Sequence, residues 1–90
     1  MTIDKARFEM FVFFAESVWG DWTPIESKVY NLFNEQNELV GSLSWLEIKN
    51  GFLNCNTKEE LDNLINVEWK YIDEELTEGL NELLEDIDTE

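Results

Sequence analysis

The sequence predicts an α+β protein that is mainly helical and forms a single domain over residues 1–90. Residues 57–90 repeat apolar side chains at the three-to-four spacing of one helical face. The apolar stretch Thr2–Trp19 fits a helix, and Leu39–Asn54 contains the alternation and the Asn50-Gly51 dipeptide that are typical of a β-hairpin. We therefore expect an αα-hairpin, then a β-hairpin, then a long acidic C-terminal helix, with an all-α fold as the alternative.

The first expected helix covers residues 3–19, where strand and helix compete. A strand would place phenylalanines on both of its faces and would need burial on both sides. In a helix, Lys5, Glu9 and Glu16 share one narrow polar stripe, and Gly20 stands at the position favoured after a helix end. We prefer the helix to the strand and expect it to be the central element of the core.

A second helix is predicted from Pro24 to about Gln36. Its start is marked by Thr23-Pro24-Ile25-Glu26, which combines an N-cap threonine, proline at the first helical position and glutamate at the third helical position. The expected apolar face consists of Ile25, Val29, Leu32 and Phe33. Because the link Gly20–Trp22 is short, the first two helices should form an αα-hairpin.

The predicted β-hairpin has strands near Leu43–Lys49 and Phe52–Cys55. Asn50-Gly51 between them suits a type I′ turn, since both turn positions need positive φ. A lone two-stranded hairpin is marginal in water, so we expect it to pack on the helices.

The C-terminal stretch combines an inward apolar stripe with an acidic outer face. Thr57 and Glu60 have the spacing of a capping box at its start, and Asn66 or Gly79 could bend so long a helix. Between Lys58 and Glu90 there are thirteen acids and two lysines. Of the last 20 residues, nine are acids and none is basic, which gives about one charge per 3.3 Å along a helix of about 30 Å. One DNA strand carries one charge per about 3.4 Å.

The acids of this stretch are the main candidates for binding a partner. Glu74, Glu78, Glu82 and Glu85 form a ridge opposite the apolar stripe. Neighbouring like charges at this spacing destabilise a helix, so local stability alone would not favour the ridge. Aromatic side chains near acids are candidate anchors, because Trp and Tyr are enriched at interface hot spots. The predicted partner-binding residues are Asp73, Glu74, Glu75, Glu78, Glu82, Glu85, Asp86, Tyr71 and Trp22.

Composition argues against several other classes of function. The net charge of −15 should repel nucleic acid and anionic membranes and attract basic protein surfaces. The chain has no histidine and one cysteine, Cys55, which we expect to be a small buried strand residue. We therefore expect no enzymatic activity, no catalytic residues, no metal and no cofactor. Without an apolar membrane-spanning run or a secretory signal, a soluble protein of the bacterial cytoplasm is expected.

In size and charge the chain resembles the virus-encoded DNA mimics, which disarm restriction or CRISPR nucleases and other DNA-binding proteins. The resemblance implies a small acidic inhibitor that occupies the nucleic-acid-binding surface of a basic partner protein. One alternative is an immunity protein or antitoxin that masks one basic toxin. Another is an acidic helical adaptor, which could form a homodimer through the stripe that contains Leu76, Leu80 and Leu83. The identity of the target and the phage or host origin stay open.

Overall fold

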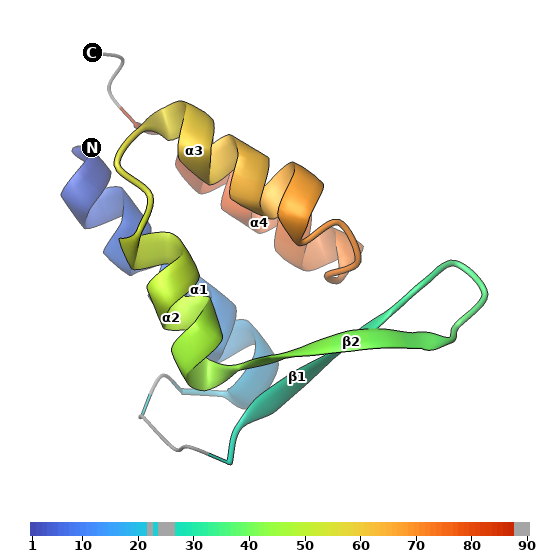
Figure 1. Ribbon diagram of the computed structural model, residues 1–90. Helices are drawn as coiled ribbons and strands as arrows, with labels where there is room; N and C mark the ends of the chain where they lie inside the picture. The colour runs from blue at the N-terminus through green and yellow to red at the C-terminus, as the bar shows by residue number, and fades with distance from the viewer. Residues whose placement is uncertain (22, 24–26, 88–90) are drawn as a thin grey trace.

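The fold is known from a computed structural model that describes residues 1–21, 23 and 27–87. It is α+β and mainly helical, as predicted, with a two-stranded antiparallel sheet. The elements are α1 (Ile3–Trp19), β1 (Val29–Phe33), β2 (Leu39–Ser44), α2 (Trp45–Leu53), α3 (Lys58–Asn63), the π-helical segment η1 (Leu64–Glu68) and α4 (Glu74–Glu85). Figure 1 shows the helices gathered together and the β-hairpin projecting to one side.

The first helix, α1, confirms the prediction for residues 3–19. Its start is capped by Thr2, whose hydroxyl oxygen accepts the Lys5 N–H at 3.3 Å. It ends at Gly20, which has φ 84° and donates its N–H to the Glu16 carbonyl. α1 packs against both α2 and α4. Phe14 lies fully buried among the rings of Tyr30, Phe52 and Trp69.

The predicted helix from Pro24 to Gln36 is wrong over its described part. Val29–Phe33 is strand β1, in which Tyr30 and Leu32 are half-buried while the three residues that alternate with them are exposed. The chain then reverses at Asn34, whose side-chain oxygen accepts the N–H groups of Gln36 and Glu38. The αα-hairpin is therefore absent from the described residues, and the start predicted at residues 24–26 lies outside them.

The β-hairpin predicted around Asn50-Gly51 is wrong, and the hairpin that the structure contains is built from β1 and β2, earlier in the chain. β1 pairs with β2 from Val29 opposite Ser44 to Phe33 opposite Leu39, with a bulge next to Phe33. The inner side of the hairpin packs on the helices, as expected, through the buried Leu43 and the half-buried Tyr30.

The segment predicted as strands Leu43–Lys49 and Phe52–Cys55 is mostly helix α2. Ser44 and Glu47 form a capping box, in which each side chain accepts the other residue's backbone N–H. Asn50-Gly51 lies within this helix and is not a turn. Gly51 faces the Trp69 ring, where an added Cβ would lie 2.6 Å from ring carbon Cζ2. Close packing, rather than positive φ, therefore accounts for this glycine.

The C-terminal stretch is two antiparallel helical rods instead of one long helix (Figure 1). The predicted start at Thr57 is confirmed, because the Thr57 hydroxyl oxygen accepts the Glu60 N–H at 3.1 Å. The reciprocal half of the predicted capping box is not formed, since the Glu60 side chain accepts the N–H of Asn56 instead of Thr57. α3 and η1 end at Trp69, which is buried, and α4 begins only at Glu74. The predicted irregularity at Asn66 falls in the π-helical segment, whereas Gly79 lies inside α4 against the Phe13 ring.

The core draws on all of these helices and on β2. Its largest fully buried side chains are Phe14, Phe52, Met10, Ile48, Leu61, Ile65 and Leu80. Trp45 and Trp69 are also core residues. No helix in the part of the chain that the structure describes is both long and apolar enough to cross a membrane.

Candidate partner-binding surface

The predicted acidic ridge is present on the outer side of α4. Glu74, Glu78, Glu82 and Glu85 are all exposed, and steps of four, four and three residues keep them on one side of the helix. The opposite side is buried through Leu76, Leu80 and Leu84. However, α4 has 12 residues, so its length is about 18 Å instead of the 30 Å that one continuous helix would give.

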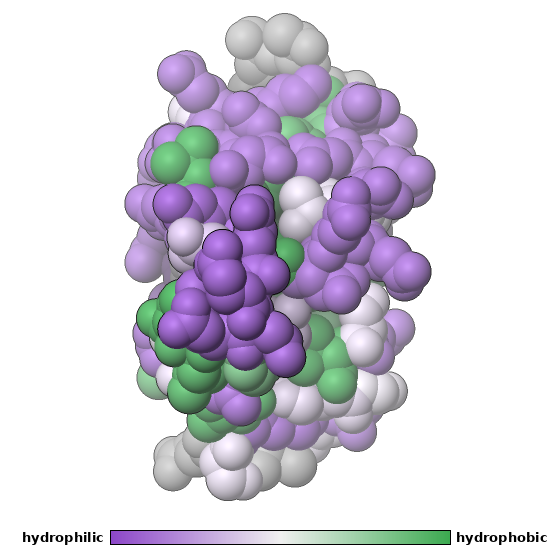
Figure 2. Space-filling model, turned by 90° about the vertical axis from the view of Figure 1, so that its right-hand side faces the viewer, coloured by the Kyte–Doolittle hydropathy of each residue, from purple (hydrophilic) through white to green (hydrophobic). Residues whose placement is uncertain are grey.

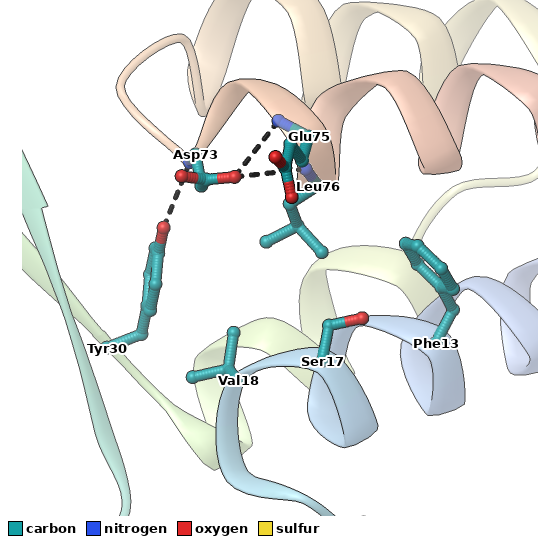
Figure 3. A pocket seen from close by; sticks show the side chains of 7 residues that line it. All are labelled: Phe13, Ser17, Val18, Tyr30, Asp73, Glu75 and Leu76. Carbon is teal, nitrogen blue, oxygen red and sulfur yellow. Dashed lines mark hydrogen bonds between the residues drawn. The ribbon is translucent and has the colours of Figure 1, made fainter.

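Asp73, which was predicted to bind a partner, has a structural role in this surface. It is the N-cap of α4, and its Oδ1 accepts the N–H groups of Glu75 at 2.9 Å and Leu76 at 3.3 Å. Its own N–H donates to the hydroxyl oxygen of Tyr30 at 2.9 Å (Figure 3). Asp73 thus starts the acidic helix and fixes this start to the β-hairpin.

Glu75 lies apart from the ridge, on the side of α4 that faces α1 and the hairpin. It lines a hollow of about 460 Å³ together with Phe13, Ser17 and Tyr30 (Figure 3). Asp86 follows the end of α4, and its carbonyl oxygen accepts a hydrogen bond from the Met1 ammonium group at 3.1 Å. Of the predicted acids, Glu74, Glu78, Glu82 and Glu85 therefore form the continuous row.

A second acidic row, which we did not predict as part of the site, lies beside the ridge. The side-chain amides of Asn66 and Asn81 pair reciprocally at 3.0 and 3.1 Å and join the η1 segment to α4. Asn66 also donates to Asp62 at 2.7 Å, and Glu59 lies one turn before Asp62 on the same side of α3. Because Asn66 bonds both Asp62 and Asn81, the Asp62 carboxylate lies beside α4, where Glu78 and Glu85 are each within about one helical turn of Asn81.

Among the residues that the structure describes, no basic side chain forms an ion pair with the carboxylates of either row. Residues 58–87 hold eleven acids and two lysines, and every one of these acids is exposed. Within the described residues, the ion pairs join Lys5 to Glu9, Arg7 to Asp4 and Lys28 to Asp21, and none involves the acids of residues 58–87. Hydrophilic surface covers much of the face seen in Figure 2.

Of the two predicted aromatic anchors, Tyr71 and Trp22, the structure describes only Tyr71. Tyr71 is not on the acidic side of a long helix. It lies in the turn before α4, is 38% exposed, and has the Lys70 ammonium 5.0 Å from its ring centroid. Trp22 lies outside the described residues. The exposed apolar residues of the hairpin, which were not predicted as a site, are Val29, Phe33, Leu39 and Val40.

Cys55 is buried, as predicted, but it lies in the loop after α2 and not in a strand. Its thiol donates to the Gly51 carbonyl oxygen at 3.3 Å. Burial, with smaller contributions from Glu60 and Glu68, raises the pKa of this thiol above its ordinary value. The thiol is therefore held in its protonated, weakly nucleophilic form.

The described residues contain no group of three His, Cys, Asp or Glu side chains placed to hold a metal ion. Comparisons of the chain with protein-family models, with curated proteins and with solved structures gave no match. The chemistry of this acidic surface is therefore the basis for inferring a function.

Proposed function

We propose that the chain is an acidic inhibitor that binds the nucleic-acid-binding surface of a basic protein, such as a nuclease or another DNA-binding protein. The observation that carries the proposal is the pair of adjacent helices whose exposed carboxylates form no ion pair with any described residue. Such a surface attracts a basic groove and competes with nucleic acid for it.

The two-row arrangement supports imitation of a duplex better than one straight rod does. Packed helices lie about 8–10 Å apart, between the widths of about 6 and 12 Å of the two grooves of B-DNA. The four acids of the ridge, from Glu74 to Glu85, span 12 residues, or about one charge per 4.5 Å at the helical rise. One DNA strand carries one charge per about 3.4 Å, so the ridge alone is less dense than a strand and the acids beside it add to its charge.

The test is a pull-down from a bacterial lysate with the full chain as bait, followed by low-salt and high-salt washes. We expect nucleic-acid-binding proteins that elute with salt and that duplex DNA displaces, because screening weakens an association based on charge. Recovery of no such protein, or of proteins that still bind DNA when the chain is bound to them, would overturn the proposal.

A pair of charge variants tests whether the α4 row is the binding surface. The triple variant Glu78→Gln, Glu82→Gln, Glu85→Gln should lose most of the capture. The control Glu9→Gln, Glu16→Gln, Glu38→Gln removes the same charge from α1 and the hairpin turn and should retain most of it. Equal loss in both variants would show that net charge alone attracts the partner.

The exposed apolar side chains of the hairpin favour a second candidate, an immunity protein or antitoxin that masks one basic toxin. Leu39 is 63% exposed, and Val29, Phe33 and Val40 are each close to half exposed. A lock on one partner depends on a few anchors, whereas a mimic spreads its binding energy over many carboxylates. Loss of all capture in Leu39→Ala or Tyr71→Ala, with the triple charge variant still binding, would favour the lock.

The adaptor alternative would need a dimer interface other than the stripe first considered. Leu76 and Leu80 are buried in the chain's own core, and Leu83 packs against it.

A further inference from the structure

A groove lies between the hairpin and the start of α4, at the end of the ridge where Glu74 stands. Its volume is about 730 Å³. One wall is formed by the end of β1 and the following turn, through Phe33 and Glu35, and the other by Tyr71 and Glu74. In Figure 2, the polar hairpin turn projects toward the viewer, with a hollow beside it.

The groove combines two features that suit a cationic side chain. Phe33 and Tyr71 are 46% and 38% exposed, so parts of both rings remain open to a ligand. Glu35 and Glu74 are exposed, and neither forms an ion pair within the described residues. Aromatic faces and carboxylates together attract cations, and a guanidinium can both stack on a ring and bind a carboxylate through two N–H groups.

The groove already contains one cation of the chain itself. The Lys70 ammonium lies 5.0 Å from the Tyr71 ring centroid, within the range of a cation–π contact. Lys70 is exposed on a flexible stem, so a guanidinium from a partner can displace it. Lys70 is thus an internal competitor for the Tyr71 ring.

Hydrogen bonds fix both walls of the groove. The Asn34 side chain and main chain hold the hairpin turn through four bonds to Gln36 and Glu38. The bond from the Asp73 N–H to the Tyr30 hydroxyl ties the opposite wall to the hairpin. A pre-formed site loses less conformational entropy when it binds.

We propose that this groove binds an arginine side chain of the basic protein that the acidic rows attract. The proposal rests on the function inferred above and adds to it a residue-specific contact. Charge complementarity selects a cation, and stacking on a ring together with a two-point bond to a carboxylate favours guanidinium over ammonium.

The test compares binding of the full chain to fluorescent arginine and lysine homopeptides of equal length. The expected result is a clear preference for arginine, because both cations can contact a ring but only a guanidinium can also stack on it and bind a carboxylate through two N–H groups. Tyr71→Ala and Phe33→Ala should each reduce this preference, and Phe8→Ala, which removes an exposed ring from α1, should leave it unchanged. Lys70→Gln should raise the preference, while Lys58→Gln, with the same change in charge, should not.

Equal binding of the two peptides by the unmodified chain, or an unchanged preference in Tyr71→Ala, would overturn the groove proposal. Because the two peptides carry the same charge, the overall attraction that the acidic rows exert cancels in the ratio of the two affinities. A chain that captures DNA-binding proteins without preferring arginine overturns this proposal alone. A chain that prefers arginine but captures no such protein overturns the proposed function.

Discussion

Replacing Asp73 by alanine or by asparagine separates the structural role of this residue from its charge. Both changes remove one negative charge, but asparagine keeps a side-chain oxygen that can accept the N–H groups of Glu75 and Leu76. An N-cap Asp or Asn is worth about 1 kcal/mol more than alanine. For a domain of this size, that difference lowers the melting temperature by about 4–8 °C. We therefore expect Asp73→Ala to melt lower than Asp73→Asn by that amount in circular dichroism.

The control is Glu75→Ala, which removes a carboxylate from the same turn, but one that forms no capping bond to the backbone. Its melting temperature should change little. The cap also holds one wall of the groove, so Asp73→Ala should reduce the preference for arginine more than Asp73→Asn does. Equal melting temperatures for the two Asp73 variants would refute the assignment of this side chain as the cap of α4.

Two further predictions concern the core. Gly51→Ala should lower the free energy of unfolding measured in urea, because the new Cβ would lie 2.6 Å from the Trp69 ring, which Phe14 and Phe52 hold in place. The overpacking costs about 1–3 kcal/mol, which should exceed the roughly 1 kcal/mol that alanine gains over glycine in a helix. A variant as stable as the parent would contradict this packing. Cys55 should react with iodoacetamide more slowly than a cysteine peptide, and its reaction rate should rise only at higher pH, because burial raises the pKa of the thiol. The unfolded chain is the control. A pH profile of the folded chain that matches the profile of the peptide would contradict the burial.

The first helix could be predicted because its signals are local. Its polar stripe and Gly20 lie within the segment, and they agree with the burial of one face. The β-hairpin could not be placed in the same way. Val29, Leu32 and Phe33 fit a helical face, while the alternation about Tyr30 and Leu32 fits a strand, and packing against α1 favours the strand.

The turn predicted at Asn50-Gly51 was wrong for a different reason, because a competing local signal favoured a helix over the same residues. Ser44 and Glu47 have the spacing of a capping box, which predicts a helix from Trp45 onward. Burial of Trp45, Ile48 and Phe52 on one side of that helix agrees with it. The turn preference of Asn-Gly was outweighed by these signals, and Gly51 is needed for its contact with Trp69.

A local sequence pattern also marks the break between η1 and α4. Asp73 followed by two glutamates is an N-cap with acids in the first helical turn, and it predicts a new helix start. The apolar spacing continues through Trp69 and Ile72, which are both buried in the turn itself, so the periodicity alone hides the break.

The break determines how much of the candidate surface could be predicted. The acids of α4 could be named from the sequence, because exposure on the outer side of a helix follows from spacing. Their neighbours could not, because Asp62 comes beside the middle of α4 only through the chain reversal at Trp69–Asp73. Glu35 comes to the groove at the start of α4 only through the reversal at Asn34–Glu38. One turn therefore creates both the second acidic row and one wall of the groove. If the groove binds arginine as proposed, charge would provide the attraction and this turn the selectivity, so Asp73→Ala should weaken selectivity more than attraction.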